Sequence, residues 1–152
     1  MPTPETCELA IPARLANLAS IAAFTEDAVR AWSQTPQEAY DIQMAVDEAC
    51  ANIVSYAYPD EVDGLIELAI MCGDDACTVT IHDHGAPFDP IAIPDPDIDA
   101  PLEARSIGGL GLFLMRRLMN EVRFHFDEQD GNTLTMVKRR ATVSPAAQTG
   151  TP

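Results

Sequence analysis

The sequence predicts one α+β domain, in which helices pack against a single β-sheet. Two segments with helical spacing of apolar residues come first, a β-hairpin follows them, and a third helix then precedes a second hairpin. The chain has 152 residues, of which 47% are hydrophobic, and this is enough for one core. We therefore expect a single folded domain over residues 7–140 and a disordered tail, rich in Ala, Thr, Ser and Pro, over 141–152.

The first half of the chain predicts a short strand and two helices. Residues 8–11 are a strand candidate, and apolar residues recur at helical spacing over 14–32. A second helix is expected over 35–58, where Pro59 ends it. Its start is marked by a capping residue, a first-turn proline and the glutamate of a capping box: Thr35, Pro36 and Glu38.

One polar pair on the second helix suggests chemistry. Glu48 and Asn52 are four residues apart, so they lie on one helical face, beside the apolar stripe of that helix. A carboxylate in this position can polarise a nucleophile while the amide holds a metal ion. The alternative is a solvated surface pair, and the neighbouring Asp47 is expected to be a surface carboxylate.

The first hairpin places a carboxylate at a strand end. Residues 65–72 and 77–83 read as two strands around the turn Gly73-Asp74-Asp75. Asp83 is in phase with Val79 and Ile81, so it should point to the covered face of the sheet. A buried charge needs a protein donor or a ligand as partner, although a simple turn with Gly85 is an alternative interpretation.

The second half predicts a glycine-rich turn, a helix and another hairpin. Gly108-Gly109-Leu110-Gly111 precedes a helix over 112–120, and helix starts of this kind offer free N–H groups to anionic oxygens. Strands over 122–126 and 132–137 flank a turn at Gln129-Asp130-Gly131 and should extend the same sheet. The long Pro- and Asp-rich segment between Gly85 and Gly108 is a candidate lid, with Arg105 as its only positive charge.

Composition excludes some partners and locations. The net charge is −15 with only nine Lys and Arg, which argues against a nucleic-acid surface. No signal peptide or apolar run of membrane length is present, so we expect a cytoplasmic protein without membrane contact. The four cysteines lack zinc-like spacing, and Cys72 and Cys77 flank the hairpin tip, where they are expected to be reduced.

The ordered set Glu48-x-x-x-Asn52, Asp83-x-Gly85 and Gly108-Gly109-x-Gly111 resembles the Bergerat ATP-binding fold of gyrase, histidine kinases and the bacterial anti-sigma-factor serine kinases. It is most similar to the serine kinases, and the resemblance makes residues 7–140 a histidine-kinase-like ATP-binding domain. The fold implied is an α+β two-layer sandwich. Its mixed, mainly antiparallel sheet of four or five strands carries three helices on one face.

The resemblance also implies roles for individual residues. Glu48 would be the general base that activates a serine on a substrate protein, and Asn52 would coordinate Mg²⁺. Asp83 would hydrogen-bond the adenine amino group of ATP, and Gly85 would make room beside the base.

Further nucleotide-binding positions follow from the same resemblance. Gly108, Gly109 and Gly111 would bracket the lid and meet the phosphates, Thr133 would lie near the adenine, and we include Arg105 from the loop. The partners implied are an anti-sigma-factor antagonist and a sigma factor, and the related kinases are usually homodimers. Two departures are Tyr56, where the family often has histidine, and the Pro- and Asp-rich lid.

The leading hypothesis is therefore an ATP-dependent serine-protein kinase and anti-sigma factor of a partner-switching pathway. The main alternative is a non-catalytic module that binds ATP or ADP and contacts a protein partner in a nucleotide-dependent way. A detached catalytic domain of a histidine kinase is a third, weakened by the lack of upstream dimerisation helices with a phospho-acceptor histidine.

Overall fold

The computed structural model describes residues 5–58, 64–86 and 109–140. These contain one five-stranded sheet with the strand order β1-β2-β3-β5-β4. Every pairing between these strands is antiparallel, so the expected mainly antiparallel sheet has no parallel pair in this part of the chain. The strands are β1 (Glu5–Pro12), β2 (Leu65–Cys72), β3 (Ala76–Asp83), β4 (Glu121–Asp127) and β5 (Gly131–Arg139).

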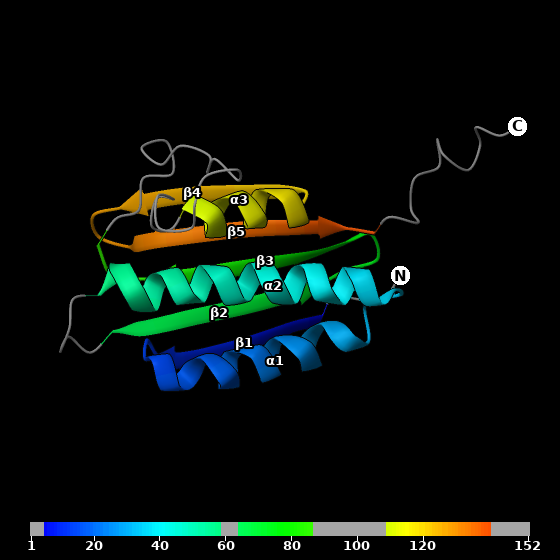
Figure 1. Cartoon of the computed structure of the whole chain (residues 1–152), viewed down its shortest axis with the longest axis horizontal. Helices are drawn as coiled ribbons and strands as arrows, with labels where there is room; N and C mark the ends of the chain where they lie inside the picture. Colours follow the sequence, from blue (N-terminus) through cyan, green and yellow to red (C-terminus); the bar gives the residue numbers. More distant parts are fainter. Residues whose placement is uncertain (1–4, 59–63, 87–108, 141–152) are drawn as a thin grey trace, which may run out of the picture.

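The described part of the chain has three α-helices, and they lie on one face of this sheet, which confirms the predicted two-layer arrangement (Figure 1). They are α1 (Leu18–Arg30), α2 (Pro36–Asn52) and α3 (Gly109–Leu118). The core lies between the two layers, where side chains alternate inward along the strands. Its large, fully buried members include Ile21, Val29, Ile42, Val46, Ile66, Ile70, Val79, Ile81, Leu112, Met115 and Met136.

The start of α2 has the predicted capping box. The backbone N–H of Glu38 donates to the Thr35 side chain at 3.2 Å, and Glu38 Oε1 accepts from the Thr35 N–H at 3.2 Å. A cap of this kind contributes about 1 kcal/mol to helix stability. It fixes the register of α2 and therefore the direction in which Glu48 and Asn52 point.

The ends of the helices differ from the sequence expectations for physical reasons. A short 3-10 turn, Leu15–Asn17, precedes α1, and the Asn17 side chain donates to the Pro12 carbonyl at 2.9 Å. After Asn52 the α-helix passes into a π-helical turn, Ile53–Ala57. The third helix begins at Gly109, three residues earlier than expected. Glycine lowers the stability of a helix, but a helix can include it.

The end of the sheet at the β2–β3 turn is held by long-range hydrogen bonds. Trp32 Nε1 donates to the Gly73 carbonyl at 2.8 Å, and Arg140 donates to the carbonyls of Trp32 and Asp74. The Arg140 guanidinium also lies 4.8 Å from the centre of the Trp32 ring. These contacts join α1, the hairpin tip and the end of β5.

A second set of contacts joins α2, α3 and β5. Lys138 Nζ lies 2.7 Å from Asp41 Oδ2 and donates to the Leu118 carbonyl at 2.7 Å. Both side chains of the ion pair are largely shielded from water.

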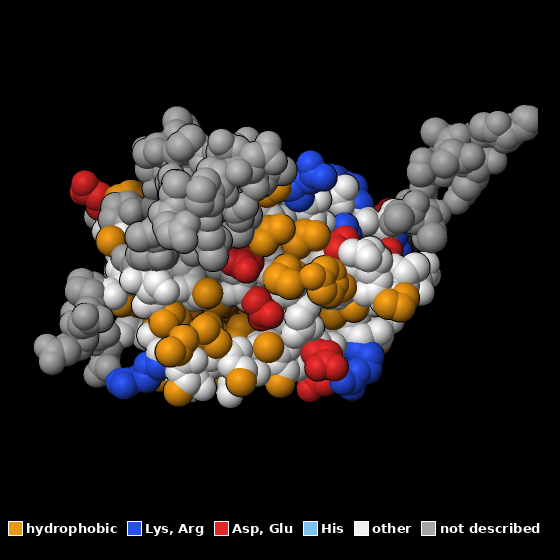
Figure 2. Space-filling view, in the orientation of Figure 1, with side chains coloured by type: hydrophobic (Ala, Val, Ile, Leu, Met, Phe, Trp, Pro, Cys, Tyr) orange, Lys and Arg blue, Asp and Glu red, His pale blue; other side chains and the backbone are white. Residues whose placement is uncertain are grey.

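The helix-bearing face of the molecule shows hydrophobic and acidic side chains side by side (Figure 2). None of the helices in the described ranges is long and apolar enough to cross a membrane.

Candidate functional site

A pocket lies between the C-terminal half of α2, α3 and the adjoining ends of β3 and β5. It brings together Asn52, Asp83 and Thr133, three residues that are far apart in the sequence and that were predicted for one site. The walls between them are mostly apolar and are formed by Ala49, Ile53, Ala57, Met115, Phe124 and Leu134. An apolar cleft with few polar groups is the usual form of a site for a flat organic ring.

At one end of the pocket, α3 meets the polar pair of α2. A Cβ atom built on Gly111 would lie 3.0 Å from Glu48 Oε2 and 3.4 Å from Asn52 Nδ2. Gly111 is therefore next to both side chains, and a glycine leaves them room. The structure thus brings together Glu48, Asn52 and Gly111, as the sequence predicted.

Asp83 points to the helix-covered face, as its phase in the strand predicted, and it is 5% exposed. Its Oδ1 accepts from the Gly85 N–H at 2.8 Å and from Asn132 Nδ2 at 2.9 Å. The predicted turn with Gly85 and the predicted buried position therefore both occur. Both bonds use the same oxygen, and no donor to Oδ2 is present among the described residues.

Gly85 packs against the end of the π-helical turn that follows α2, where there is no room for a side chain. A Cβ at this position would be 2.4 Å from the Ala57 carbonyl oxygen, which is too close for any other residue. The next N–H, that of Ala86, donates to the same carbonyl at 2.6 Å. Tyr58 supports this junction, because its hydroxyl accepts from the His84 N–H at 2.8 Å and donates to the Leu65 carbonyl at 2.9 Å.

Asn132 is a site residue that the sequence reasoning missed. It is the cross-strand partner of Asp83 and lines the same pocket. In the sequence it stands next to the turn glycine Gly131 and reads as an ordinary hairpin residue. Only the pairing of β3 with β5, which are distant in the sequence, shows where it lies.

Burial changes the ionisation of two residues beside the polar pair. Asp47 is half-buried rather than a surface carboxylate, and burial followed by the charge of Glu48 raises its pKa. Burial, with smaller effects from Asp47 and Asp83, raises the pKa of Cys50 to about 12. Cys50 is therefore a protonated core thiol at neutral pH.

Two predicted nucleotide-binding positions cannot be placed in the site. Arg105 and Gly108 lie outside the described residues, as does the candidate lid over 87–108. The predicted tail over 141–152 and the Tyr56 side chain also lie outside them. Gly109 is the first residue of α3, directly before the turn that carries Gly111.

A match to a known family identifies the class of domain that has this fold and pocket. A family model described as the histidine kinase-like ATPase domain matches residues 11–138. That range includes all the described residues that line the pocket, from Ala49 to Leu134.

Curated relatives identify the branch. The chain is 34% identical over 128 residues to the serine-protein kinase RsbW of Listeria monocytogenes, covering 82% of this chain and 74% of the relative. It is 31% identical over 139 residues to the serine-protein kinase RsbW of Halalkalibacterium halodurans, covering 89% and 83%. The chain therefore belongs to the RsbW-type serine-protein kinases of the histidine kinase-like ATPase family.

A solved structure supports the fold independently. The crystal structure of the RsbU and RsbW domains of Rv1364c from Mycobacterium tuberculosis matches with a TM-score of 0.65 and 20% identity. The match covers 91% of this chain and 32% of that one. With 20% identity, the match shows that the two chains share a fold.

Proposed function

We propose that this chain transfers the γ-phosphoryl group of ATP to a serine of an anti-sigma-factor antagonist, and that it binds a sigma factor or a similar regulator in turn. Glu48 acts as the general base toward the serine hydroxyl, and Asn52 provides an oxygen ligand to Mg²⁺. Asp83 accepts a hydrogen bond from the adenine amino group. An in-line transfer of this kind needs positioning, metal ions and a base, with little covalent chemistry from the protein.

The observation that carries this proposal is the contact between Gly111 and the pair Glu48 and Asn52. Because α3 begins next to that pair, its first N–H groups are near the amide and the carboxylate, where phosphates and Mg²⁺ would meet. Asp83 lines the pocket together with Asn52, the member of the pair that faces it. The purine thus fits beside Asp83 and the phosphates beside Gly111.

The individual side chains suit these roles. An amide oxygen such as that of Asn52 is a hard ligand of the type that Mg²⁺ prefers, and such sites usually share the ion with substrate phosphates. The Oδ2 of Asp83, which has no donor among the described residues, can accept a hydrogen bond, while Oδ1 is used by the protein. The pair Gly108 and Gly109, with Arg105 of the lid and Thr133 in the pocket, completes the proposed nucleotide contacts.

The proposed partners are proteins. The chain carries a net charge of −15, which suits a basic protein surface better than nucleic acid. We include a homodimer in the proposal, because the anti-sigma-factor serine kinases that the sequence resembles are usually dimeric.

The first experiment tests the nucleotide site. Thermal unfolding is measured with and without Mg-ATP and Mg-ADP, for the wild type and for Asp83→Asn. The asparagine keeps an oxygen for Gly85 and Asn132 but presents an NH₂ group in place of Oδ2, so the fold should survive while adenine recognition fails. Ligand at about 100 times Kd should stabilise the wild type by roughly 2.7 kcal/mol, a shift of several degrees. The absence of a shift in the wild type would overturn the proposal.

The second experiment separates a kinase from a non-catalytic nucleotide-binding module. Glu48→Gln is compared with Asp47→Asn, a matched removal of the neighbouring carboxylate, in transfer of labelled phosphate from ATP to a candidate antagonist and to its serine-to-alanine variant. The proposal expects loss of transfer in Glu48→Gln with nucleotide binding retained, and near-normal transfer in Asp47→Asn. If the wild type binds ATP and the antagonist but never transfers phosphate, the non-catalytic module is the better description.

A further inference from the structure

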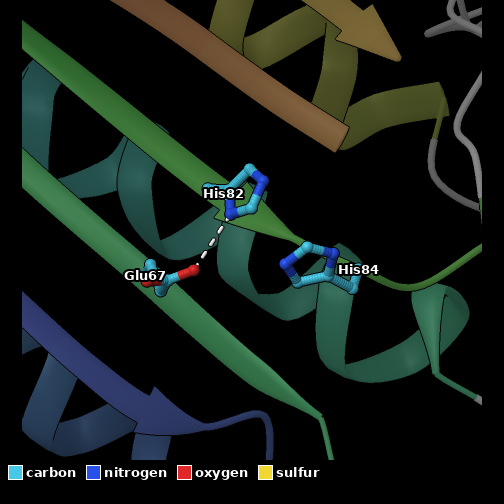
Figure 3. Close-up of side chains that lie close together, drawn as sticks. All are labelled: Glu67, His82 and His84. Atoms are coloured by element: carbon cyan, nitrogen blue, oxygen red, sulfur yellow. Dashed lines mark hydrogen bonds and ion pairs between the residues drawn. The ribbon is translucent and has the colours of Figure 1, made fainter. Parts of the chain in front are cut away.

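Three side chains of types that can bind a metal ion lie close together on the open face of the sheet, away from the helices. The members of this cluster are Glu67 on β2, His82 on β3 and His84, just after β3 (Figure 3). Along β3 the side chains alternate, so Val79, Ile81 and Asp83 face the helices and His82 faces the other way. The cluster is therefore separate from the nucleotide pocket, although Asp83 stands between its two histidines in the sequence.

The three side chains converge. Glu67 and His82 are direct cross-strand partners, and Glu67 Oε1 lies 3.0 Å from His82 Nδ1. The rings of His82 and His84 have centroids 4.6 Å apart and meet edge to face. One oxygen of Glu67 and one nitrogen of each histidine all lie within 4.8 Å of one another, so small side-chain rotations bring them to a common centre.

The second nitrogen of His82 indicates what belongs at that centre. Nε2 is hydrogen-bonded to the Asp130 carbonyl, which can only accept, so Nε2 carries a hydrogen. In the neutral imidazole, Nδ1 then carries no hydrogen, and its lone pair faces Glu67 Oε1 at 3.0 Å. Two acceptors this close require a cation between them, either a proton or a metal ion. A histidine that donates its other N–H to a backbone carbonyl is the usual arrangement of a metal ligand.

We propose that Glu67, His82 and His84 bind one divalent transition-metal ion of the Zn²⁺ class. Imidazole nitrogens suit Zn²⁺, Ni²⁺ and Cu²⁺, whereas Mg²⁺ and Ca²⁺ prefer sites made of oxygen alone. Two histidines and one carboxylate provide three protein ligands, and water completes the coordination. Glu67 and His84 are exposed, so the ion is reached directly from solvent.

The site would link β2 to the end of β3 behind the nucleotide pocket. Glu67 belongs to β2, whereas His82 and His84 flank the residue proposed to recognise adenine. The proposal does not depend on kinase activity, since it concerns the opposite face of the sheet.

The test is isothermal titration calorimetry of the nucleotide-free full chain with ZnCl₂, in a non-chelating buffer with a phosphine reductant. The proposal expects one equivalent of saturable binding. Removal of one ligand, in His84→Ala or in Glu67→Gln, should weaken binding at least about tenfold. Glu67→Gln keeps a hydrogen-bonding group beside His82, and His84 is exposed, so both variants should fold; circular dichroism checks this.

Two control variants exclude other Zn²⁺ ligands. His125→Asn removes the third histidine of the chain, and Cys72→Ser breaks the pair of neighbouring thiols; both should bind Zn²⁺ as the wild type does. Binding that is unchanged in His84→Ala, or that is lost in Cys72→Ser, would overturn the proposal. Absence of saturable binding would overturn it as well and would leave a proton as the cation between Glu67 and His82.

Discussion

Asn132 Nδ2 donates to Asp83 Oδ1 at 2.9 Å, from the strand next to the one that carries Asp83. The same amide nitrogen lies 3.2 Å from the Gly85 carbonyl oxygen and 3.1 Å from that of Ala86. One side chain thus fixes the carboxylate and the start of the segment that follows it.

We predict that Asn132→Ala destabilises the fold by about 1–3 kcal/mol, because it leaves a buried carboxylate with one donor fewer. Nucleotide affinity should fall too, since Asp83 is no longer held in place. Urea unfolding measures the first effect and titration with a fluorescent ATP analogue the second. Asn17→Ala, which removes a single exposed hydrogen bond, is the control and should change both values little. Equal effects of the two variants would contradict this role of Asn132.

Gly111→Ala should separate stability from activity. Alanine is favoured over glycine inside a helix by up to about 1 kcal/mol, so α3 should not be weakened. The added methyl group would lie 3.0 Å from Glu48 Oε2 and would push that carboxylate from its position. We expect an unchanged or higher melting temperature and a marked fall in phosphoryl transfer. An unaltered transfer rate would show that Glu48 does not need its present position.

The ion pair between Lys138 and Asp41 should behave as a buried pair. Lys138→Met leaves Asp41 with only the Gln37 side chain among the described residues, and the loss of one partner of a buried pair costs about 3–5 kcal/mol. The double variant Asp41→Leu, Lys138→Met should lose less than Lys138→Met alone, because no uncompensated charge is left. Urea unfolding of the two variants and of Asp41→Leu completes the cycle. If the double variant were the least stable, burial of an unpaired Asp41 charge would not be the main cause of the lost stability.

Cys72 and Cys77 should form a disulfide under mild oxidation. They are cross-strand partners, and their sulfur atoms lie 3.3 Å apart as free thiols. The hydrogen bond between the two thiols lowers the pKa of Cys72 and raises that of Cys77, so Cys72 is the more reactive thiol.

Treatment with a diazene-type thiol oxidant should remove two hydrogens and two titratable thiols per chain, measured by mass spectrometry. Cys7→Ser and Cys50→Ser should oxidise in the same way, whereas Cys72→Ser should not. A cross-link through Cys7 would contradict the prediction that Cys72 and Cys77 are the pair that oxidises.

Much of the fold could be predicted because local signals agreed with it. The capping box at Thr35 fixed the start of α2, and alternation along 77–83 gave the direction of Asp83. The pairing of Glu48 with Asn52 needed only the helical repeat. Asn132 and the π-helical turn after Asn52 could not be predicted, since both depend on contacts between segments that are distant in the sequence. The lid residues Arg105 and Gly108 stay predictions.

The π-helical turn at Ile53–Ala57 directly follows Asn52 and has one residue more than an α-helical turn. Removal of one residue there would restore an α-helix without moving Asn52. The wider turn takes up the extra residue, so this deletion would let Ala57 and Tyr58 keep their places beside Gly85 and His84. A length difference of one residue at this point is therefore a marker, readable in any related sequence, of whether the turn after Asn52 is π-helical or α-helical.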